Sequence, residues 1–343
     1  MPEQSGSKRT KTGKAKVIVV AVLALAAFVA VKTGWMGFGW AQLKSKTFPR
    51  DEALLAWVPP DTQAVAIVDP HQLDLKALGA EQGTARAALE RVRKDIKSAT
   101  NIDLVFDVDK LVMTPNLVIA RGRFDGEKLA SKLAEYRYVK GEHNSQRYLA
   151  RAGEDAIAVI DDEILLYGDE PSIKAAIDAR SGDSLEKNEK FTQRLSLMGW
   201  DRPLLVTVQL SDDRPSLRSM LTGATGPRAV TVGVRTERGL DVKADIEAAS
   251  PTAADELAKL LEEKRVGAAE YFGGTLGAEL SPPLAEVAKG ATIKTAPPTN
   301  LVKIQAHVSQ ETLDRSITAA GKSTSLGEFY KTLRLFQLLA PSH

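Results

Sequence analysis

The sequence predicts an α+β fold built from antiparallel sheets with helices packed on one face. Strand candidates are joined in pairs by short turns, and several of them run directly into a helix that begins with a polar capping residue. A doubly wound parallel sheet fits less well, because hairpins outnumber single strand-to-helix crossovers. With 343 residues, of which 43% are hydrophobic and 26% charged, the chain has the composition of a globular protein of about two domains.

The N-terminal part combines a basic tail with a long apolar run. Residues 1–16 carry five basic side chains and one acidic one, and residues 17–31 contain no charge, proline or glycine. Continued to Trp35, this run would form a helix about 28 Å long, which matches the hydrocarbon core of a bilayer if Lys32 reaches the headgroups. We therefore expect a cytoplasmic tail at 1–16 and a transmembrane helix, in contact with the lipid bilayer, from Val17 to Trp35.

The distribution of charge sets the expected orientation. The tail has a formal charge of +4 in a chain of net +2, so the remainder is slightly acidic. By the positive-inside rule the tail stays cytoplasmic, although Lys44 and Lys46 on the far side weaken the bias. In a bacterium this predicts an inner-membrane protein whose bulk is periplasmic. Ala24, Leu25 and Ala26 fit an alternative, a signal peptide that is cleaved.

The expected body begins after a linker at 36–53 and contains two α+β modules, at 54–213 and 226–340. In the first module we expect, in chain order, a strand at 63–69, a helix at 84–98, a hairpin at 156–168 turning at Asp161 and Asp162, a helix capped by Asp169, and a strand at 204–210. In the second we expect a hairpin from the strands 229–234 and 240–246, a helix capped by Ser250, and a C-terminal helix at 326–339. That last helix either closes the module or binds a partner.

Two stretches of the chain align without a gap, at 116–133 (NLVIARGRFDGEKLASKL) and 300–317 (NLVKIQAHVSQETLDRSI). Each predicts a strand followed by a helix, with Asp125 or Ser309 as the N-cap. The match indicates that the two modules are related copies. It also fits chance, because all strand-to-helix units share these preferences.

The sequence contains no established reactive motif. The absence of cysteine excludes disulfides, cysteine-ligated zinc, iron–sulfur clusters and thiol nucleophiles. The near-neutral charge argues against a nucleic-acid binder. Gly321 to Thr324 resembles the end of a phosphate-binding loop, but Ser316 stands where the motif needs glycine, so a helix C-cap is the better interpretation.

Three groups of polar residues are candidate sites, and each has a structural interpretation. Asp103, Asp107 and Asp109 lack the spacing of a calcium loop and fit turns on the surface that bracket a short strand. The histidines and tyrosines considered are His71, His143, His307, His343, Tyr136, Tyr138 and Tyr148. The histidines show no zinc-ligand spacing, and no G-x-S-x-G nucleophile motif occurs. The tyrosines fit packing on a strand face better than stacking on a sugar or base.

The order of these features resembles loosely defined bacterial membrane-anchored proteins with an exported domain of unknown function. The resemblance rests on Pro59 to Thr62 opening onto a hydrophobic strand, on the strand-to-helix unit at 122–133, and on the hairpin at Gly239 and Leu240 before the Ser250 helix. It covers roughly residues 54–321 and implies location and fold, but no activity.

From these observations we expect a non-enzymatic, single-pass envelope protein with no catalytic, cofactor-binding or metal-binding residues and no cofactor. Its exported part would act as an interaction or scaffold module, with other envelope proteins or further copies of itself as partners. The alternative is a periplasmic module that holds a lipid or another small apolar ligand between sheet and helices. An enzyme is the third and weakest hypothesis, because a catalytic triad can be assembled from distant residues.

Overall fold

The computed structural model describes residues 52–72, 94, 96–103, 106–210, 227–237, 239–274 and 288–312. The expected tail and transmembrane helix (1–35), the Gly321 segment and the C-terminal helix (326–339) lie outside these ranges. The expected linker does so too, except for its last two residues, which begin helix α3 (Glu52–Leu55). Among the described residues, no helix is both long enough and apolar enough to span a bilayer.

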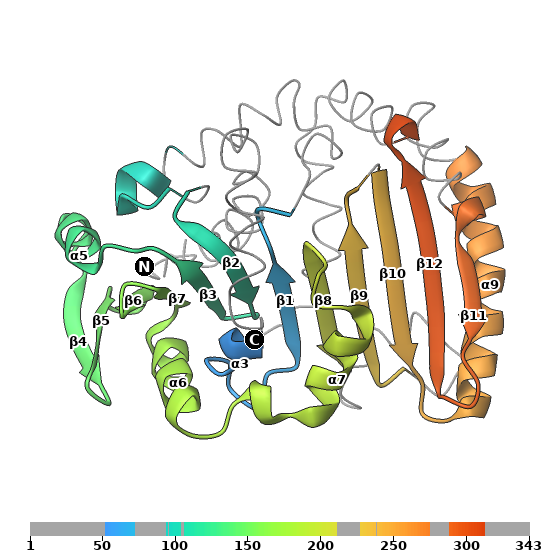
Figure 1. Cartoon of the computed structure of the whole chain (residues 1–343), viewed down its shortest axis with the longest axis horizontal. Helices are drawn as coiled ribbons and strands as arrows, with labels where there is room; N and C mark the ends of the chain where they lie inside the picture. Colours follow the sequence, from blue (N-terminus) through green and yellow to red (C-terminus); the bar gives the residue numbers. More distant parts are fainter. Residues whose placement is uncertain are drawn as a thin grey trace, which may run out of the picture.

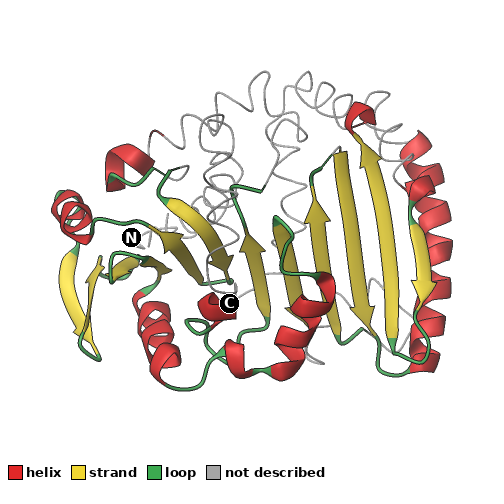
Figure 2. Ribbon diagram, in the orientation of Figure 1, coloured by secondary structure: helices red, strands yellow, loops and turns green. Residues whose placement is uncertain are grey.

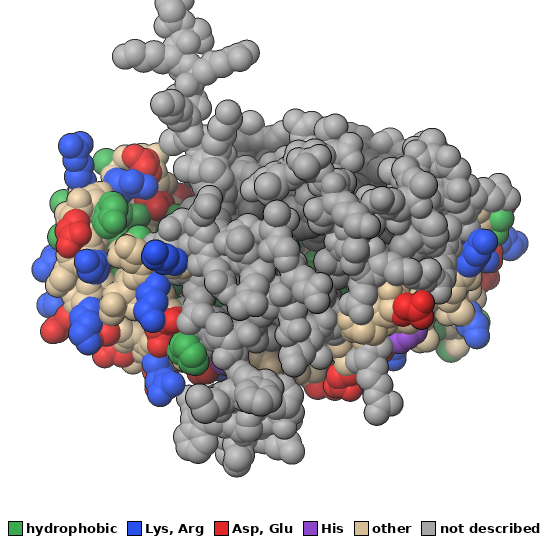
Figure 3. Space-filling model, turned by 90° about the horizontal axis from the view of Figure 1, so that it is seen from above, with side chains coloured by type: hydrophobic (Ala, Val, Ile, Leu, Met, Phe, Trp, Pro, Cys, Tyr) green, Lys and Arg blue, Asp and Glu red, His purple; other side chains and the backbone are tan. Residues whose placement is uncertain are grey.

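The described strands form one twelve-stranded antiparallel sheet in the order β11-β12-β10-β9-β8-β1-β2-β3-β7-β6-β5-β4 (Figure 1). Their bounds are β1 (Ala64–Val68), β2 (Val108–Met113), β3 (Leu117–Gly122), β4 (Val139–His143), β5 (Gln146–Ala150), β6 (Ala156–Ile160), β7 (Ile164–Gly168), β8 (Leu204–Gln209), β9 (Ala229–Arg235), β10 (Gly239–Glu247), β11 (Thr292–Thr295) and β12 (Leu301–Ser309). Because β8 pairs with both β1 and β9, the sheet is continuous across the boundary expected between the two modules. Basic and acidic side chains lie at both ends of the molecule (Figure 3).

Helices cover both faces of the sheet, so the expectation of a single covered face is wrong. On one face lie α3, α6 (Glu170–Ser181) and α7 (Glu189–Met198), which share a core cluster with alternate residues of β1, β3 and β8. On the other face lie α5 (Gly126–Ala134) and α9 (Pro251–Gly274) (Figure 2). The physical reason is the composition of strands in the interior of the sheet. β1 (AVAIV) and β6 (AIAVI) are apolar on both sides and need cover on both.

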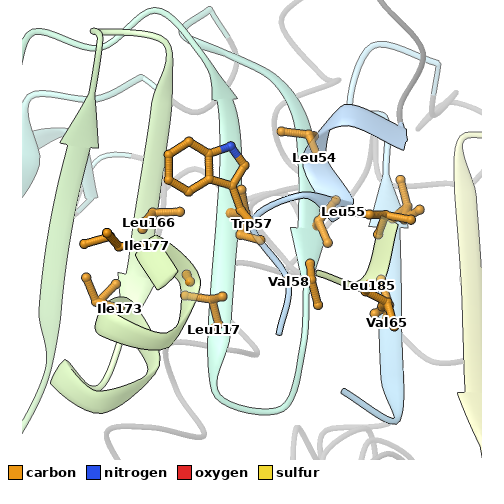
Figure 4. Packing of buried hydrophobic residues seen from close by; sticks show 14 of the residues in the cluster. Leu54, Leu55, Trp57, Val58, Val65, Leu117, Leu166, Ile173, Ile177 and Leu185 are labelled. Atoms are coloured by element: carbon orange, nitrogen blue, oxygen red, sulfur yellow. The ribbon is translucent and has the colours of Figure 1, made fainter. Parts of the chain in front are cut away.

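The main core lies between the sheet and α3, α6 and α7. Figure 4 shows the part of it that includes Leu54 and Leu55 of α3 and Ile173 of α6. The side chains of Leu54 and Leu55 are at most 1% exposed and pack with the rest of the cluster, to which Ile173 of α6 and Phe191 of α7 also belong. Trp57 lies two residues after the end of α3 and belongs to the same cluster. The Arg180 guanidinium lies over the Trp57 ring, 5.7 Å from its centroid, in a cation–π contact.

Several local predictions are confirmed. The hairpin at 156–168 forms as β6 and β7, and its turn residues Asp161 and Asp162 both have positive φ, as a tight turn of this hand requires. The Asp169 side chain accepts a hydrogen bond from the Ser172 amide at the start of α6. The predicted helix at 84–98 is helical where it is described, at 94 and 96–98.

The two aligned stretches both form a strand followed by a capped helical turn. The Asp125 carboxylate accepts from the Lys128 amide at 2.9 Å, and the Ser309 hydroxyl accepts from the Thr312 amide at 3.2 Å. Their strands hold different places in the sheet, however. Counted outward from the neighbouring strands β1 and β8, β3 is the third strand on its side, whereas the third strand on the other side is β10, not β12.

Candidate functional site

The acidic trio does not converge on a common point. Asp103 is buried, where the sequence predicted a surface turn, and its carboxylate pairs with the Lys97 ammonium at 2.9 Å. The Asp107 carboxylate accepts from the Asp103 amide at 2.7 Å and so closes the turn before β2, while Asp109 lies within β2. In the described part of the chain, no group of three or more acidic or histidine side chains is placed to hold a metal ion.

The described histidines lie on separate elements, each near one carboxylate. His143 Nε2 lies 2.7 Å from Asp178 of α6, and His307 Nδ1 lies 2.7 Å from Asp241 of β10. The His71 ring is 3.6 Å from Asp109. These contacts tie neighbouring elements together and do not assemble a nucleophile with its base. His343 lies outside the described residues.

The strand-face prediction is confirmed for Tyr148, which lies in β5, but Tyr138 precedes β4 and Tyr136 is 47% exposed. Tyr148 is buried under β4, and its hydroxyl donates to Glu170 at 2.7 Å. Tyr138 and Tyr167 both donate to the same oxygen of Asp155, at 2.7 and 2.9 Å, and Arg151 donates twice to the other oxygen. Burial, reinforced by this carboxylate, raises the pKa of both hydroxyls well above the usual value.

A buried ion pair lies where β1 ends. The Lys110 ammonium is 3.3 Å from the Asp69 carboxylate, and both side chains are about 5% exposed. Asp69 also accepts from the amides of His71 and Gln72 and from the Gln72 side chain, at 2.7 to 3.2 Å. This turn was predicted from Asp69-Pro70, but the lysine partner, on another strand, was not. The saturated carboxylate acts as a structural clamp between β1 and β2.

A second buried cation lies at the start of β8. Arg202 is 5% exposed, its Nε donates to the Met198 carbonyl at 2.7 Å, and its Nη1 has no hydrogen-bond partner. Its side chain lies directly over Gly233 of β9, which has no Cβ to block it. Burial lowers the pKa of Arg202, and the neighbouring Arg235 lowers it further.

Beyond Arg202, the same side of β9, β10 and β12 carries a set of polar residues that we call the charged face. It consists of Arg235, Asp241, Lys243, Asp245, Lys303, Gln305 and His307. Cross-strand register places Arg235, Asp241 and His307 in one row, and Asp245 opposite Lys303, whose ammonium is 3.1 Å away. Lys243, Gln305 and His307 are exposed. In Figure 1, α9 lies behind β11 at the right margin, and its cluster includes the opposite side of β10 and β12.

The opposite side of these strands is apolar. Ala66, Val206, Val232, Ala244 and Ile304, which we call the apolar strip, are aligned across β1, β8, β9, β10 and β12 by the register. Each is partly exposed. Of the helices described on this side, α5 packs at β6, and α9 packs at β11 and β12, where Ile304 lies against its cluster. The strip is therefore a partly exposed apolar row on the side of the sheet opposite to the charged face.

Neither surface was predicted as a site, although both leave a signal in the sequence. β10 (GLDVKADIE) and β12 (LVKIQAHVS) alternate apolar and polar residues, which indicates a sheet with one wet face. The order of the strands decides that the two wet faces are adjacent, and this order cannot be deduced from either strand alone.

Comparison with known proteins assigns no family. No family model and no curated protein matches the sequence. A solved structure described as crystal form I of TP0453 is similar with a TM-score of 0.42 and 8% identity, over 78% of this chain and 97% of that chain. The resemblance expected from Pro59 to Thr62 therefore stays a prediction.

Proposed function

We propose that this chain is a non-enzymatic, single-pass membrane protein whose exported body is an interaction module of a larger envelope assembly. The observation that carries the proposal is the charged face. Lys243, Gln305 and His307 stand exposed on adjacent strands. Beside them, Arg235 pairs with Asp201 and Lys303 pairs with Asp245, while the His307 ring contacts the Asp241 carboxylate. Basic and acidic side chains held at defined positions on a sheet support recognition of a protein surface with the complementary charge pattern.

The topology within the membrane is part of the proposal. It rests on the basic tail at 1–16 and the apolar run from Val17, which favour a cytoplasmic N-terminus and a periplasmic body. A reporter that is active only after export, fused after Arg50, is expected to be active. Activity of a cytoplasm-only reporter at the same position would overturn the orientation.

We also propose that the two halves of the sheet are related modules. β1-β2-β3-α5 and β8-β9-β10-α9 have the same order, start from the adjacent antiparallel strands β1 and β8, and place α5 and α9 on the same face. The equivalent of β3 is then β10. The match between 116–133 and 300–317 reflects a strand-to-cap junction that occurs four times among the described residues, at Asp125, Asp169, Ser250 and Ser309.

Site-specific photo-crosslinking tests the interaction role. A photoreactive amino acid replaces Gln305 in the full-length chain, and crosslinks are formed in intact membranes and identified by mass spectrometry. We expect one discrete crosslinked protein, whose yield falls severalfold when Lys243→Glu is added. The same probe at Lys259, an exposed position on α9 across the sheet, is the matched control. Equal yields at both positions, or no crosslink at Gln305, would contradict the proposal.

The apolar strip favours a second candidate function, the binding of a lipid or another small apolar molecule. A photoreactive fatty acid supplied to cells is expected to label peptides of β8 and β9 in addition to residues 17–35, which serve as an internal positive control. Replacing Val232 by Asn should reduce only the strand label. Label confined to residues 17–35 would exclude this function.

A further inference from the structure

Strand β4 is an exposed edge of the sheet. It pairs with β5 on its inner side, from Val139 opposite Ala150 to His143 opposite Gln146, and it ends the strand order. Figure 1 shows it at the left margin of the described structure. Val139 is 65% exposed, and Lys140 and Glu142 are exposed as well. The outer N–H and C=O groups of such a strand form a template for another strand.

The sequence of β4 (VKGEH) is complementary to itself. If a second copy is laid antiparallel with Gly141 opposite Gly141, Lys140 of each copy stands opposite Glu142 of the other. Centring the pair on Lys140 or on Glu142 instead places two like charges opposite one another, which is unfavourable. Charge therefore selects a single register with two-fold symmetry.

Contacts within a single chain already fix the conformation of β4. Tyr148 fills the space over Gly141, where a Cβ would lie 2.3 Å from the ring. His143 and Asn144 both contact the Asp178 carboxylate at 2.7 Å, which fixes the end of the strand to α6. A strand that is already ordered loses little conformational freedom on pairing.

We infer that two copies of this chain associate through β4, in antiparallel register about Gly141, and so join their sheets into one. This inference rests on the proposed interaction role and identifies one partner as a second copy. It uses the end of the sheet opposite to the charged face, so the two surfaces can be tested separately.

A charge swap between two copies tests the register. Full-length chains with different affinity tags are expressed together, and co-purification from membranes is measured. Lys140→Glu in both copies places two carboxylates opposite one another in each pair, and Glu142→Lys in both copies places two ammonium groups there. Each variant is therefore expected to lose about tenfold in self-association. The two variants are then combined, with Lys140→Glu in one copy and Glu142→Lys in the other. One copy then carries carboxylates at both positions and the other carries ammonium groups at both, so each facing pair again has opposite charges. Co-purification should therefore be restored.

The chain's lack of cysteine permits a direct geometric test. Directly opposite residues of an antiparallel pair have Cα atoms about 4.5 to 5.5 Å apart, which is within reach of a disulfide. Mild oxidation of a mixture of Lys140→Cys and Glu142→Cys chains should give several times more crosslinked dimer than either alone. Lys259→Cys is the control for random collision.

The outcomes separate this inference from the proposed function. A wild-type chain that does not co-purify with itself, or whose association is unchanged by both charge variants, would overturn the β4 pairing. Loss of the Gln305 crosslink with intact β4 pairing would overturn only the role of the charged face.

Discussion

The Lys110 ammonium and the Asp69 carboxylate form an ion pair at 3.3 Å with both side chains almost fully buried. Removing one partner leaves the other charge in a poorly solvated place. We expect Lys110→Met to lower the free energy of unfolding by about 3 kcal/mol or more. Chemical denaturation measures the change, with Lys259→Met on the exposed surface as the control.

Removing both charges of this pair should restore part of the lost stability. In the double variant Asp69→Asn/Lys110→Met no charge is left buried, and the asparagine oxygen still accepts from the amides of His71 and Gln72. Much of the lost stability should therefore return, and the two substitutions should not be additive. Additive losses would show that the ion pair is not the source of the effect.

The Arg202 side chain lies so close to Gly233 that only glycine fits at this position. A Cβ at this position would lie 2.4 Å from Arg202 Cδ and 2.6 Å from Met198 Cγ. Gly233→Ala should therefore destabilise the fold by about 1 to 3 kcal/mol, as overpacking does elsewhere. Gly290→Ala, with open space around its Cβ, is the matched control and should have little effect. Equal stabilities of the two variants would contradict this packing.

The sequence predicts the individual turns and helix caps well, but it does not predict on which faces of the sheet the helices pack. Asp161-Asp162 and the capping residues Asp169 and Ser250 are specified by neighbours within a few residues, and these predictions are confirmed. The second covered face was missed, although unbroken apolar runs in β1 and β6 indicate it. The periodicity of a strand shows how many faces are buried, but not which helix covers them.

The sites that depend on contacts distant in sequence could not be predicted. Lys110 and Asp69 lie on different strands, and the Asp155 cluster joins tyrosines from either side of it. Nothing in the local spacing of these residues distinguishes them from surface charges. The first ten residues of the helix predicted at 84–98 lie outside the described part of the chain.

We expect the free energy of unfolding to fall at alkaline pH because of Tyr138 and Tyr167. Because their pKa values are raised in the folded state, by burial first and then by Asp155, the folded chain holds protons that the unfolded chain releases near pH 10. Their contribution is complete below about pH 10 and declines as the pH rises above it. Tyrosinate absorbance during titration should show a fraction that ionises only on unfolding, and Tyr138→Phe/Tyr167→Phe should remove it. Titration of all tyrosines together near pH 10 would contradict the cluster.

The cap of α9 gives a test of a junction that the sequence alone predicted. The Ser250 hydroxyl accepts from the Ala253 amide at 3.1 Å and satisfies one of the free N–H groups of the first turn. Ser250→Ala should cost about 1 kcal/mol in the free energy of unfolding, whereas Ser250→Asp keeps an acceptor and adds a negative charge that the helix N-terminus favours. Thr252→Ala, an exposed change in the same turn, controls for helix propensity. Because α9 covers β11 and β12 through Leu257 and its neighbours, a larger loss for Ser250→Ala than for Thr252→Ala would show that this cap supports the packing of the whole second half. An equal loss in both variants would show that the cap does not contribute.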